Sequence, residues 1–146
     1  MATYIKGKSE ILAVWDDTSA YEPIVCLTSN SLSESVDEIS APRTKCDTEN
    51  ALVRESGQYS YEISFEGLYA ETEVSKLSWA EIRTKLRSLG NFTWRITTTY
   101  EGATTDIEYG TGFFSSLEKT AETEEFISFS GSLLGSGSIV AVDPNV

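Results

Sequence analysis

Histidine is absent from this chain of 146 residues, and its absence removes several kinds of chemistry at once. Catalytic pairs of Ser or Cys with His need an imidazole, and most zinc sites use at least one. The sequence also contains neither a P-loop nor a dinucleotide-binding fingerprint. Carboxylate pairs such as Asp16 and Asp17 are expected by chance in so acidic a chain. We interpret them as solvated surface residues and not as calcium ligands or the acids of a glycosidase. We therefore expect no catalytic residues, no cofactor and no metal.

Cysteine and long apolar runs are also scarce. The two cysteines, Cys26 and Cys46, are not accompanied by a signal-peptide pattern at the N-terminus. We expect free thiols rather than a disulfide, although the sequence does not say whether the two lie close together. No apolar run approaches the roughly 20 residues of a membrane-spanning helix, so we expect no membrane partner.

Positively charged residues are also few. The chain has 23 acidic residues against 11 Lys and Arg, which gives a net charge of −12. Affinity for the phosphate backbone comes largely from Lys and Arg, so this balance disfavours a nucleic-acid-binding protein. A surface lined by these acids would instead repel DNA.

One stretch, residues 76–90, has the pattern of a helix. Ser78 is a good N-cap, and Glu81 three residues later completes a capping box. An apolar stripe at helical spacing follows, formed by Trp79, Ile82, Leu86 and Leu89. Gly90 supplies the left-handed residue that commonly ends a helix. We predict a helix over about residues 78–90, with Trp79 and Leu86 buried against a sheet.

Most of the remaining chain alternates apolar and polar residues at the period of a strand. Residues 58–70 are expected to be the longest strand, and residues 92–100 alternate equally clearly. Gly110 and Gly112 suggest a bulge or kink. The pattern predicts about eight antiparallel strands, a mainly β sandwich or barrel with one flanking helix. We expect a single domain over residues 1–146, with an N-terminal arm (1–8) and a C-terminal tail (135–146).

Residues 42–57 interrupt this alternation. The segment carries many charges and little apolar content, its charged residues being Arg43, Lys45, Asp47, Glu49, Arg54 and Glu55. A charged loop of this length inside a compact domain is unusual unless it binds something. We therefore predict a loop with a binding role.

Several stretches taken together resemble the major tail tube protein of long-tailed bacteriophages and gene transfer agents. The resemblance is carried by residues 25–33, residues 44–47, Gly57 at the start of a long strand, the single helix, Trp94-Arg95-Ile96 and residues 126–134. It covers nearly the whole chain, although no single motif is diagnostic. Pro42 and Arg43 depart from the family, whose members tend to continue a strand there.

The resemblance implies a β-sandwich with one flanking helix, a fold that also occurs in the type VI secretion tube protein. Family members form hexameric rings whose inner strands join into one barrel, and the rings stack into a tube for DNA ejection. It also implies a location in the virion tail after synthesis in the host cytoplasm. The expected partners are further copies of the chain, the tape measure protein, tail terminator and baseplate proteins, and genomic DNA that passes without specific binding. Residues 42–57 would reach a neighbouring ring.

Two sets of residues are candidates for roles in such a tube. Glu62 and Glu66 lie on the polar face of residues 58–70, and this face is expected to line either the lumen or the exterior. Arg83 and Arg87 lie one turn apart on the helix. They are expected either to meet acidic groups of an adjacent subunit or to form a solvated face.

Two other classes of protein share this composition. A carbohydrate-binding, lectin-like β-sandwich would also be acidic and rich in aromatic residues, and three Trp residues could build a sugar platform. Trp79 and Trp94 fall on faces that the alternation assigns to the core, which argues against such a platform. A small glycosidase would need two buried acids facing one cleft, and no spacing in the sequence demands them.

Overall fold

The computed structural model describes Tyr4, Lys6 and residues 10–16, 20–24, 27–39, 55–69, 78–99 and 105–145. These residues form one antiparallel seven-stranded sheet and one helix. The elements are β1 (Glu10–Trp15), β2 (Tyr21–Pro23), β3 (Leu27–Ile39), β4 (Glu55–Leu68), α1 (Trp79–Arg87), β5 (Phe92–Thr99), β6 (Thr105–Thr120) and β7 (Ser128–Val140). The predicted fold class is confirmed: the structure is mainly β with one flanking helix, and over the described residues the sheet is not closed.

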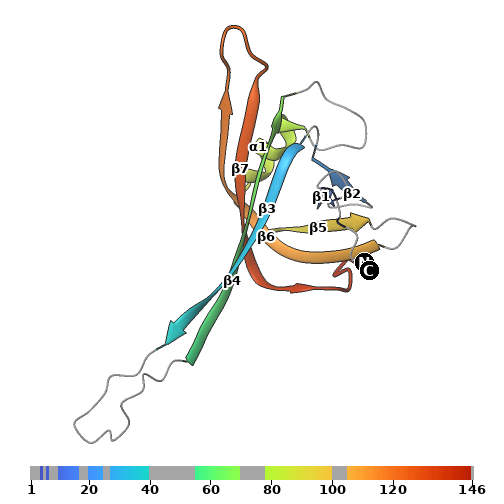
Figure 1. Ribbon diagram of the computed structural model, residues 1–146, viewed down its shortest axis with the longest axis vertical. Coiled ribbons are helices and arrows are strands. Elements are labelled where there is room, and N and C mark those ends of the chain that lie inside the picture. The colour runs from blue at the N-terminus through green and yellow to red at the C-terminus, as the bar shows by residue number, and fades with distance from the viewer. Residues whose placement is uncertain are drawn as a thin grey trace, which may run out of the picture.

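The strand order is β2-β1-β5-β6-β7-β4-β3, and β6 and β7 belong to both halves of this sheet. Residues 105–112 of β6 pair with β5, whereas residues 113–120 pair with the first half of β7. Register shifts near Tyr109 and Phe114 accompany the bend. Figure 1 shows the result: β1, β2 and β5 lie across the direction of β3 and β4. The second half of β6, the first half of β7, β4 and β3 together form what we call the long sheet.

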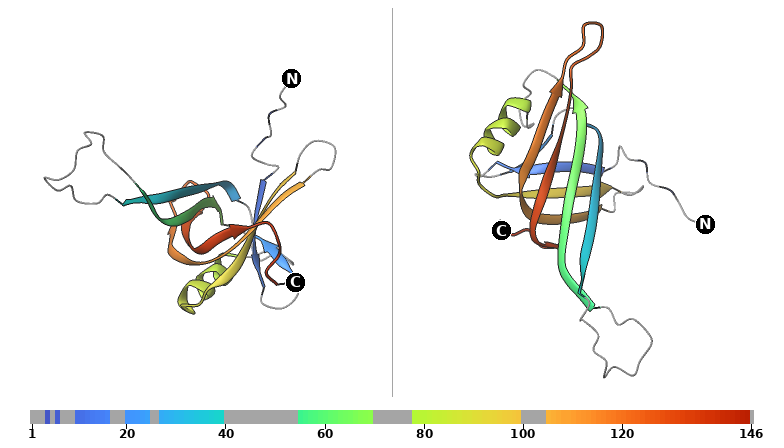
Figure 2. Two further views of the ribbon diagram at one scale, coloured as in Figure 1. Left: turned by 90° about the horizontal axis from the view of Figure 1, so that it is seen from below. Right: turned by 90° about the vertical axis from the view of Figure 1, so that its left-hand side faces the viewer.

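The core lies between the two halves of the sheet and the helix. Its largest fully buried side chains are Trp94, Phe129, Leu12, Ile63, Ile82, Leu133 and Val14. Apart from Ile82 of α1, these residues come from strands, in which these large side chains lie at every second position, as the alternation predicts. The helix covers one side of the core (Figure 2), with the Trp79 ring 5.7 Å from that of Phe129.

The helix lies where the sequence predicts it and begins, as predicted, directly after Ser78 at the N-cap position, but its C-terminal end differs from the prediction. Its residues are Trp79–Arg87, and the Ser78 side chain donates to the Glu81 carboxylate at 3.3 Å rather than capping the backbone. The positive φ belongs to Leu89 (60°), not to Gly90. Leu89 is 92% exposed and the predicted stripe therefore ends at Leu86, itself only partly buried, because the chain already turns towards β5.

Three strand predictions also need correction. Residues 55–57 belong to β4, so the predicted loop 42–57 ends earlier; residues 42–54 lie outside the described residues. The longest strand is β6, with 16 residues, and not the strand predicted at residues 58–70; β6 runs through Gly110 and Gly112, where a register shift between Tyr109 and Thr111 confirms the predicted bulge or kink. Residues 135–140, expected in a C-terminal tail, are the end of β7. Cys26, Cys46 and most of the arm 1–8 lie outside the described residues.

The Tyr61 hydroxyl links β4 to β5 and β6 through two hydrogen bonds, and its removal is a first testable prediction. Its hydroxyl donates to the Thr111 carbonyl (2.9 Å) and accepts from Trp94 Nε1 (3.1 Å), and burial raises the pKa of Tyr61. Tyr61→Phe leaves two buried polar groups without this partner, so we expect a loss of about 1–3 kcal/mol in the free energy of unfolding, measured in urea. The matched control is Tyr69→Phe, at an exposed position, which keeps the ring beside Lys119 and is expected to change stability by about 0.5 kcal/mol or less. Equal losses of unfolding free energy in both variants would mean that the Tyr61 hydroxyl is not a buried hydrogen-bonding partner of Trp94 and Thr111.

Candidate functional site

The long sheet turns one side towards the core and the other away from it. On the outward side, most residues paired across the strands are short and polar, a consequence of the alternation that buries their neighbours, and the exposed apolar exceptions are Leu68, Phe113 and Leu134. We call this surface the hydroxyl face. Its polar members are Ser29, Ser31, Ser33 and Ser35 of β3, Ser60, Glu62, Ser64 and Glu66 of β4, Ser128, Ser130 and Ser132 of β7, and Ser116, Glu118 and Thr120 of β6.

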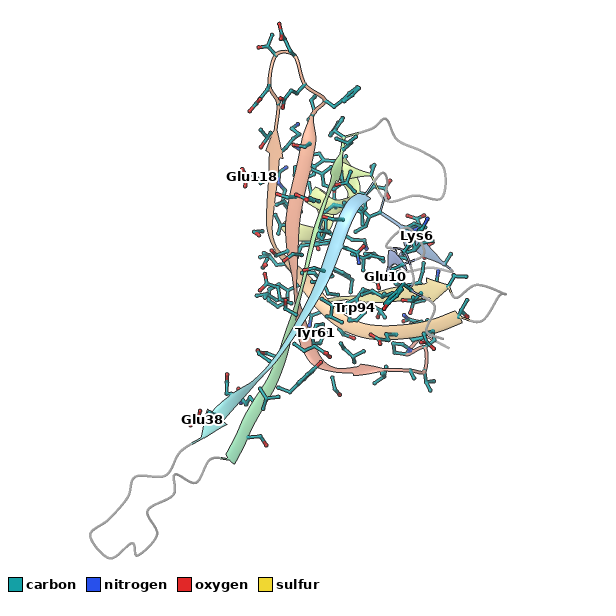
Figure 3. The ribbon with its side chains drawn as sticks, viewed as in Figure 1. Lys6, Glu10, Glu38, Tyr61, Trp94 and Glu118 are labelled. Atoms are coloured by element: carbon teal, nitrogen blue, oxygen red, sulfur yellow. The ribbon has the colours of Figure 1, made fainter. Side chains whose placement is uncertain are left out.

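The hydroxyl face is acidic. Its charged side chains are those of Glu62, Glu66 and Glu118, and no Lys or Arg lies on the part of it that the structure describes. Ser29 donates to Glu66 at 3.0 Å, and Glu118 projects outward from β6 (Figure 3). A hollow of about 540 Å³ is lined by Ser29, Glu66, Glu118 and neighbouring serines. The nearest basic residue in sequence, Lys119, instead points to the opposite side, 5.3 Å from the Tyr69 ring.

The long sheet has two open edges. β3 pairs with β4 on one side only, and residues 113–120 of β6 pair only with β7 because β5 ends at Phe92, opposite Gly112. Over the described residues no strand occupies either outer side. Open edges present unpaired backbone groups and act as templates for another chain. β3 is 13 residues long and contains no Lys, Arg or Pro, the residues that usually protect such an edge.

The direction of the strands makes the two edges complementary. Neighbours in the long sheet alternate in direction, so β6 and β3, at its two edges, run antiparallel to each other. When β3 of one copy lies beside β6 of another, the antiparallel alternation therefore continues without a break.

The basic residues of the helix lie outside the core. Arg83 and Arg87 are exposed, while Lys85 between them donates to the Trp15 carbonyl at 3.2 Å. Lys85 also lies 5.7 Å from the centre of the Phe92 ring. The two arginines therefore face outward, whereas Lys85 is tied to the sheet.

A partly buried aromatic cluster bears on the carbohydrate-binding alternative. The Tyr21 ring lies 5.0 Å from that of Trp15 and 5.7 Å from that of Tyr109, and the Arg95 guanidinium stacks on it at 4.8 Å. The Tyr21 hydroxyl donates to Asp143 at 2.8 Å, and burial raises the pKa of Tyr21 to about 12. These rings contact one another and the end of the chain rather than forming an open platform.

The comparisons with solved structures agree with this geometry, whereas neither a known sequence family nor a curated protein matches the chain. The chain is similar to the SPP1 tail tube, with a TM-score of 0.72 and 13% identity, over 92% of this chain and 77% of that one. It is similar to the tail of a gene transfer agent particle with C6 symmetry, with a TM-score of 0.71 and 14% identity, over 96% and 100% of the two chains. The chain has the tail tube fold. A tube complex of an extracellular contractile injection system shares it, with a TM-score of 0.61 and 17% identity, over 95% and 93%.

Within the tail tube fold, the structure shows where some of the predicted site residues lie, and their roles stay predictions. Glu62 and Glu66 do lie on one exposed polar face of β4. Glu118 and the serines of β7 were missed, although Ser128, Ser130 and Ser132 alternate visibly with Phe129, Gly131 and Leu133. Of the loop residues, Glu55 falls in β4, and Arg43, Lys45, Asp47, Glu49 and Arg54 lie outside the described residues.

Over the described ranges, no group of three or more Cys, Asp or Glu side chains is placed to hold a metal ion. In the same ranges, no helix is long and apolar enough to cross a membrane.

Proposed function

We propose that this chain is a structural virion protein whose copies form stacked hexameric rings, the tube of a phage-like tail, and that it is not an enzyme. The observation that carries the proposal is the long sheet, open at two complementary edges and acidic on one face. The tail tube fold supports it, since the similar chains come from tail tubes and from a tail with C6 symmetry. The protein would be made in the host cytoplasm and reside in the virion tail.

In this proposal, β3 of one copy pairs with residues 113–120 of β6 in the next. The contact joins two different surfaces, and such head-to-tail contacts generate a ring when the rotation closes. Closure removes every open edge of the long sheet, so the ring wall becomes a continuous antiparallel barrel. The number six comes from the resemblance and from the symmetry of the similar tail.

The hydroxyl face would line the lumen. Short hydroxyl side chains keep the wall smooth and hydrated, and Glu62, Glu66 and Glu118 repel the phosphates of passing DNA. A basic wall would bind phosphates and slow the transit of DNA. DNA would therefore pass without specific contacts. The same lumen would hold the tape measure protein before ejection, and terminator and baseplate proteins would cap the two ends.

Glu55 and the charged residues of segment 42–54 would contact a neighbouring ring. The segment follows the outer end of β3 and precedes β4, the two strands that form a projecting ribbon in Figure 1. Arg83 and Arg87 of α1 would form a basic face between subunits.

Electron microscopy of the concentrated protein tests the proposed function directly. We expect rings and tubes with sixfold symmetry. Protein that remains monomeric at all concentrations and salt conditions, and in the presence of the tape measure and baseplate proteins, would contradict it. A carbohydrate-binding module would in that case become the better explanation.

Charge reversal tests the assignment of the lumen. Glu62→Lys combined with Glu66→Lys is expected to preserve tubes but to slow DNA release, most strongly at low salt, where screening is weakest. The matched control reverses Asp106 and Glu108, which are exposed on the first half of β6 and lie outside the hydroxyl face. Ejection kinetics of particles that contain each variant provide the measurement. Equal kinetics for both variants at low salt would place the hydroxyl face outside the lumen.

A further inference from the structure

The hairpin that joins β6 to β7 carries an exposed aromatic side chain. Residues 121–127 form its tip, which projects beyond the rest of the molecule in Figure 1. Phe126 in this tip is 83% exposed and has acidic neighbours, Glu122, Glu124 and Glu125. A phenyl ring exposed to this degree adds nothing to the core of its own chain, so its burial in a partner would be favourable.

An apolar pocket lies at the end of the helix. It has a volume of about 280 Å³ and lies between α1 and β6, lined by Lys85, Leu86, Leu89, Gly90, Asn91, Phe113 and Phe114. This volume is close to the lower end of the roughly 300–1,000 Å³ of small-molecule pockets, which suits a single aromatic ring. Leu89 stands at the pocket, 92% exposed and with a φ of 60°, a conformation that is uncommon for a leucine.

The tip and the pocket lie at opposite ends of the second half of β6. The helix starts near the tip, where Trp79 contacts Phe129 and Lys119, and it ends beside Phe113. Figure 2 (right) shows α1 running away from the hairpin tip towards β5. Residues 113–120 of an extended strand span roughly 20 Å, so the tip does not reach the pocket of its own chain. A copy displaced along this strand direction brings its pocket to the tip.

The charges of the two surfaces are complementary. The tip presents Glu122, Glu124 and Glu125, whereas Arg83 and Arg87 are exposed on α1 and Lys85 lines the pocket itself. Opposite charges around an apolar contact steer the approach and fix its register. Like charges would face each other between two tips, which excludes a tip-to-tip contact.

We infer that Phe126 of one copy inserts into the α1 pocket of a copy in the next ring, with the tip acids facing Arg83 and Arg87. The inference rests on the proposed function, which assigns a contact between rings to segment 42–54 and none to the β6–β7 hairpin. The insertion of Phe126 supplies a contact at this second end of the subunit. Because the contact joins two different surfaces, each ring offers a tip on one side and a pocket on the other. All rings of a tube therefore have the same orientation, and this contact sets no limit on the number of rings.

Disulfide trapping tests this contact in assembled tubes. In a background of Cys26→Ser and Cys46→Ser, the double variant Phe126→Cys with Leu89→Cys is expected to give a ladder of cross-linked multimers on a non-reducing gel. Each single variant gives at most dimers, because one cysteine per chain cannot extend a series. Tubes that carry both cysteines and show no ladder would overturn the inference while leaving the proposed function intact. A ladder from Lys45→Cys with Leu89→Cys, and none with Phe126→Cys, would assign the pocket to segment 42–54 of a neighbour and would also overturn it.

Truncation and charge exchange provide a second, independent measurement. Phe126→Ala is expected to leave the melting temperature of the subunit unchanged and to raise the concentration needed for tube formation about tenfold or more. The control Val142→Ala, at another exposed apolar position (77%), should change neither quantity. Reversing Glu124 and Glu125 to Lys should weaken stacking, and reversing Arg83 and Arg87 to Glu in the same chain should restore it. Unchanged stacking in Phe126→Ala would overturn the inference, and the absence of rings in the unmodified protein would overturn the proposed function with it.

Discussion

Trp94→Ala is expected to lower the free energy of unfolding of the subunit by about 3–5 kcal/mol, the usual cost of truncating a fully buried aromatic residue. Trp94 is 0% exposed, its ring contacts that of Tyr61 at 5.6 Å, and its Nε1 donates to the Tyr61 hydroxyl. Gly110 faces the same ring, and a Cβ atom at this position would overlap it. No smaller side chain at position 94 fills this space, so the truncation leaves a cavity. Urea unfolding of the monomeric subunit measures the loss.

The control for Trp94 is an aromatic truncation at the surface. Phe126→Ala removes a ring that is 83% exposed and should change the free energy of unfolding by about 0.5 kcal/mol or less. A loss below about 1 kcal/mol in Trp94→Ala would mean that the tryptophan does not fill a closed site.

A proline in β3 is expected to abolish ring formation completely. Successive residues of an edge strand direct their N–H groups alternately to the paired strand and to the open edge. Of Ser33→Pro and Glu34→Pro, one therefore removes a backbone hydrogen bond to β4 and the other removes a backbone donor of the open edge; Glu34→Pro also removes the carboxylate that accepts from the Tyr59 hydroxyl. The first should destabilise the subunit by about 3 kcal/mol. The second should preserve a folded subunit that no longer forms rings.

The two proline variants act as controls for each other. The melting temperature identifies the variant that damages the β3–β4 pairing, and size-exclusion chromatography shows whether the stable variant still assembles. Rings formed by the stable variant would show that β3 is not the seam between subunits, and the pairing of β3 with β6 would have to be abandoned.

The sequence predicted those parts of the fold that depend on local patterns. The alternation along β5 assigned Trp94 to the core, and it is fully buried. The helix and its N-terminal end were located from Ser78, but its C-terminal end was not, because the position at which the chain turns towards β5 depends on packing around Leu86. Residues 135–140 resembled a flexible tail because Gly and Ser are common in linkers. Gly135 is there because the Tyr61 ring leaves no room for a Cβ atom, a contact between distant residues that no local pattern reveals.

For the candidate site too, the sequence revealed only what the pattern of a single strand can show. One strand sufficed to place Glu62 and Glu66 on a common polar face. Glu118 joins that face only because β7 lies between β4 and β6, so its position follows from the strand order and not from its neighbours in sequence. The two open edges follow from the bend of β6, which the sequence marked only as two glycines near a suspected kink.

The passage of β6 and β7 through both halves of the sheet also determines how the subunit comes apart. Each of these strands is hydrogen-bonded to partners in both halves, so neither half can separate while the other keeps its ladder. Thermal or chemical stress therefore meets one cooperative unit and not two subdomains with separate melting points. A half-unfolded species, with the open edges exposed and the core already lost, is the form most prone to aggregate. By making that species costly to reach, the shared strands protect newly made subunits during the interval before assembly covers their edges.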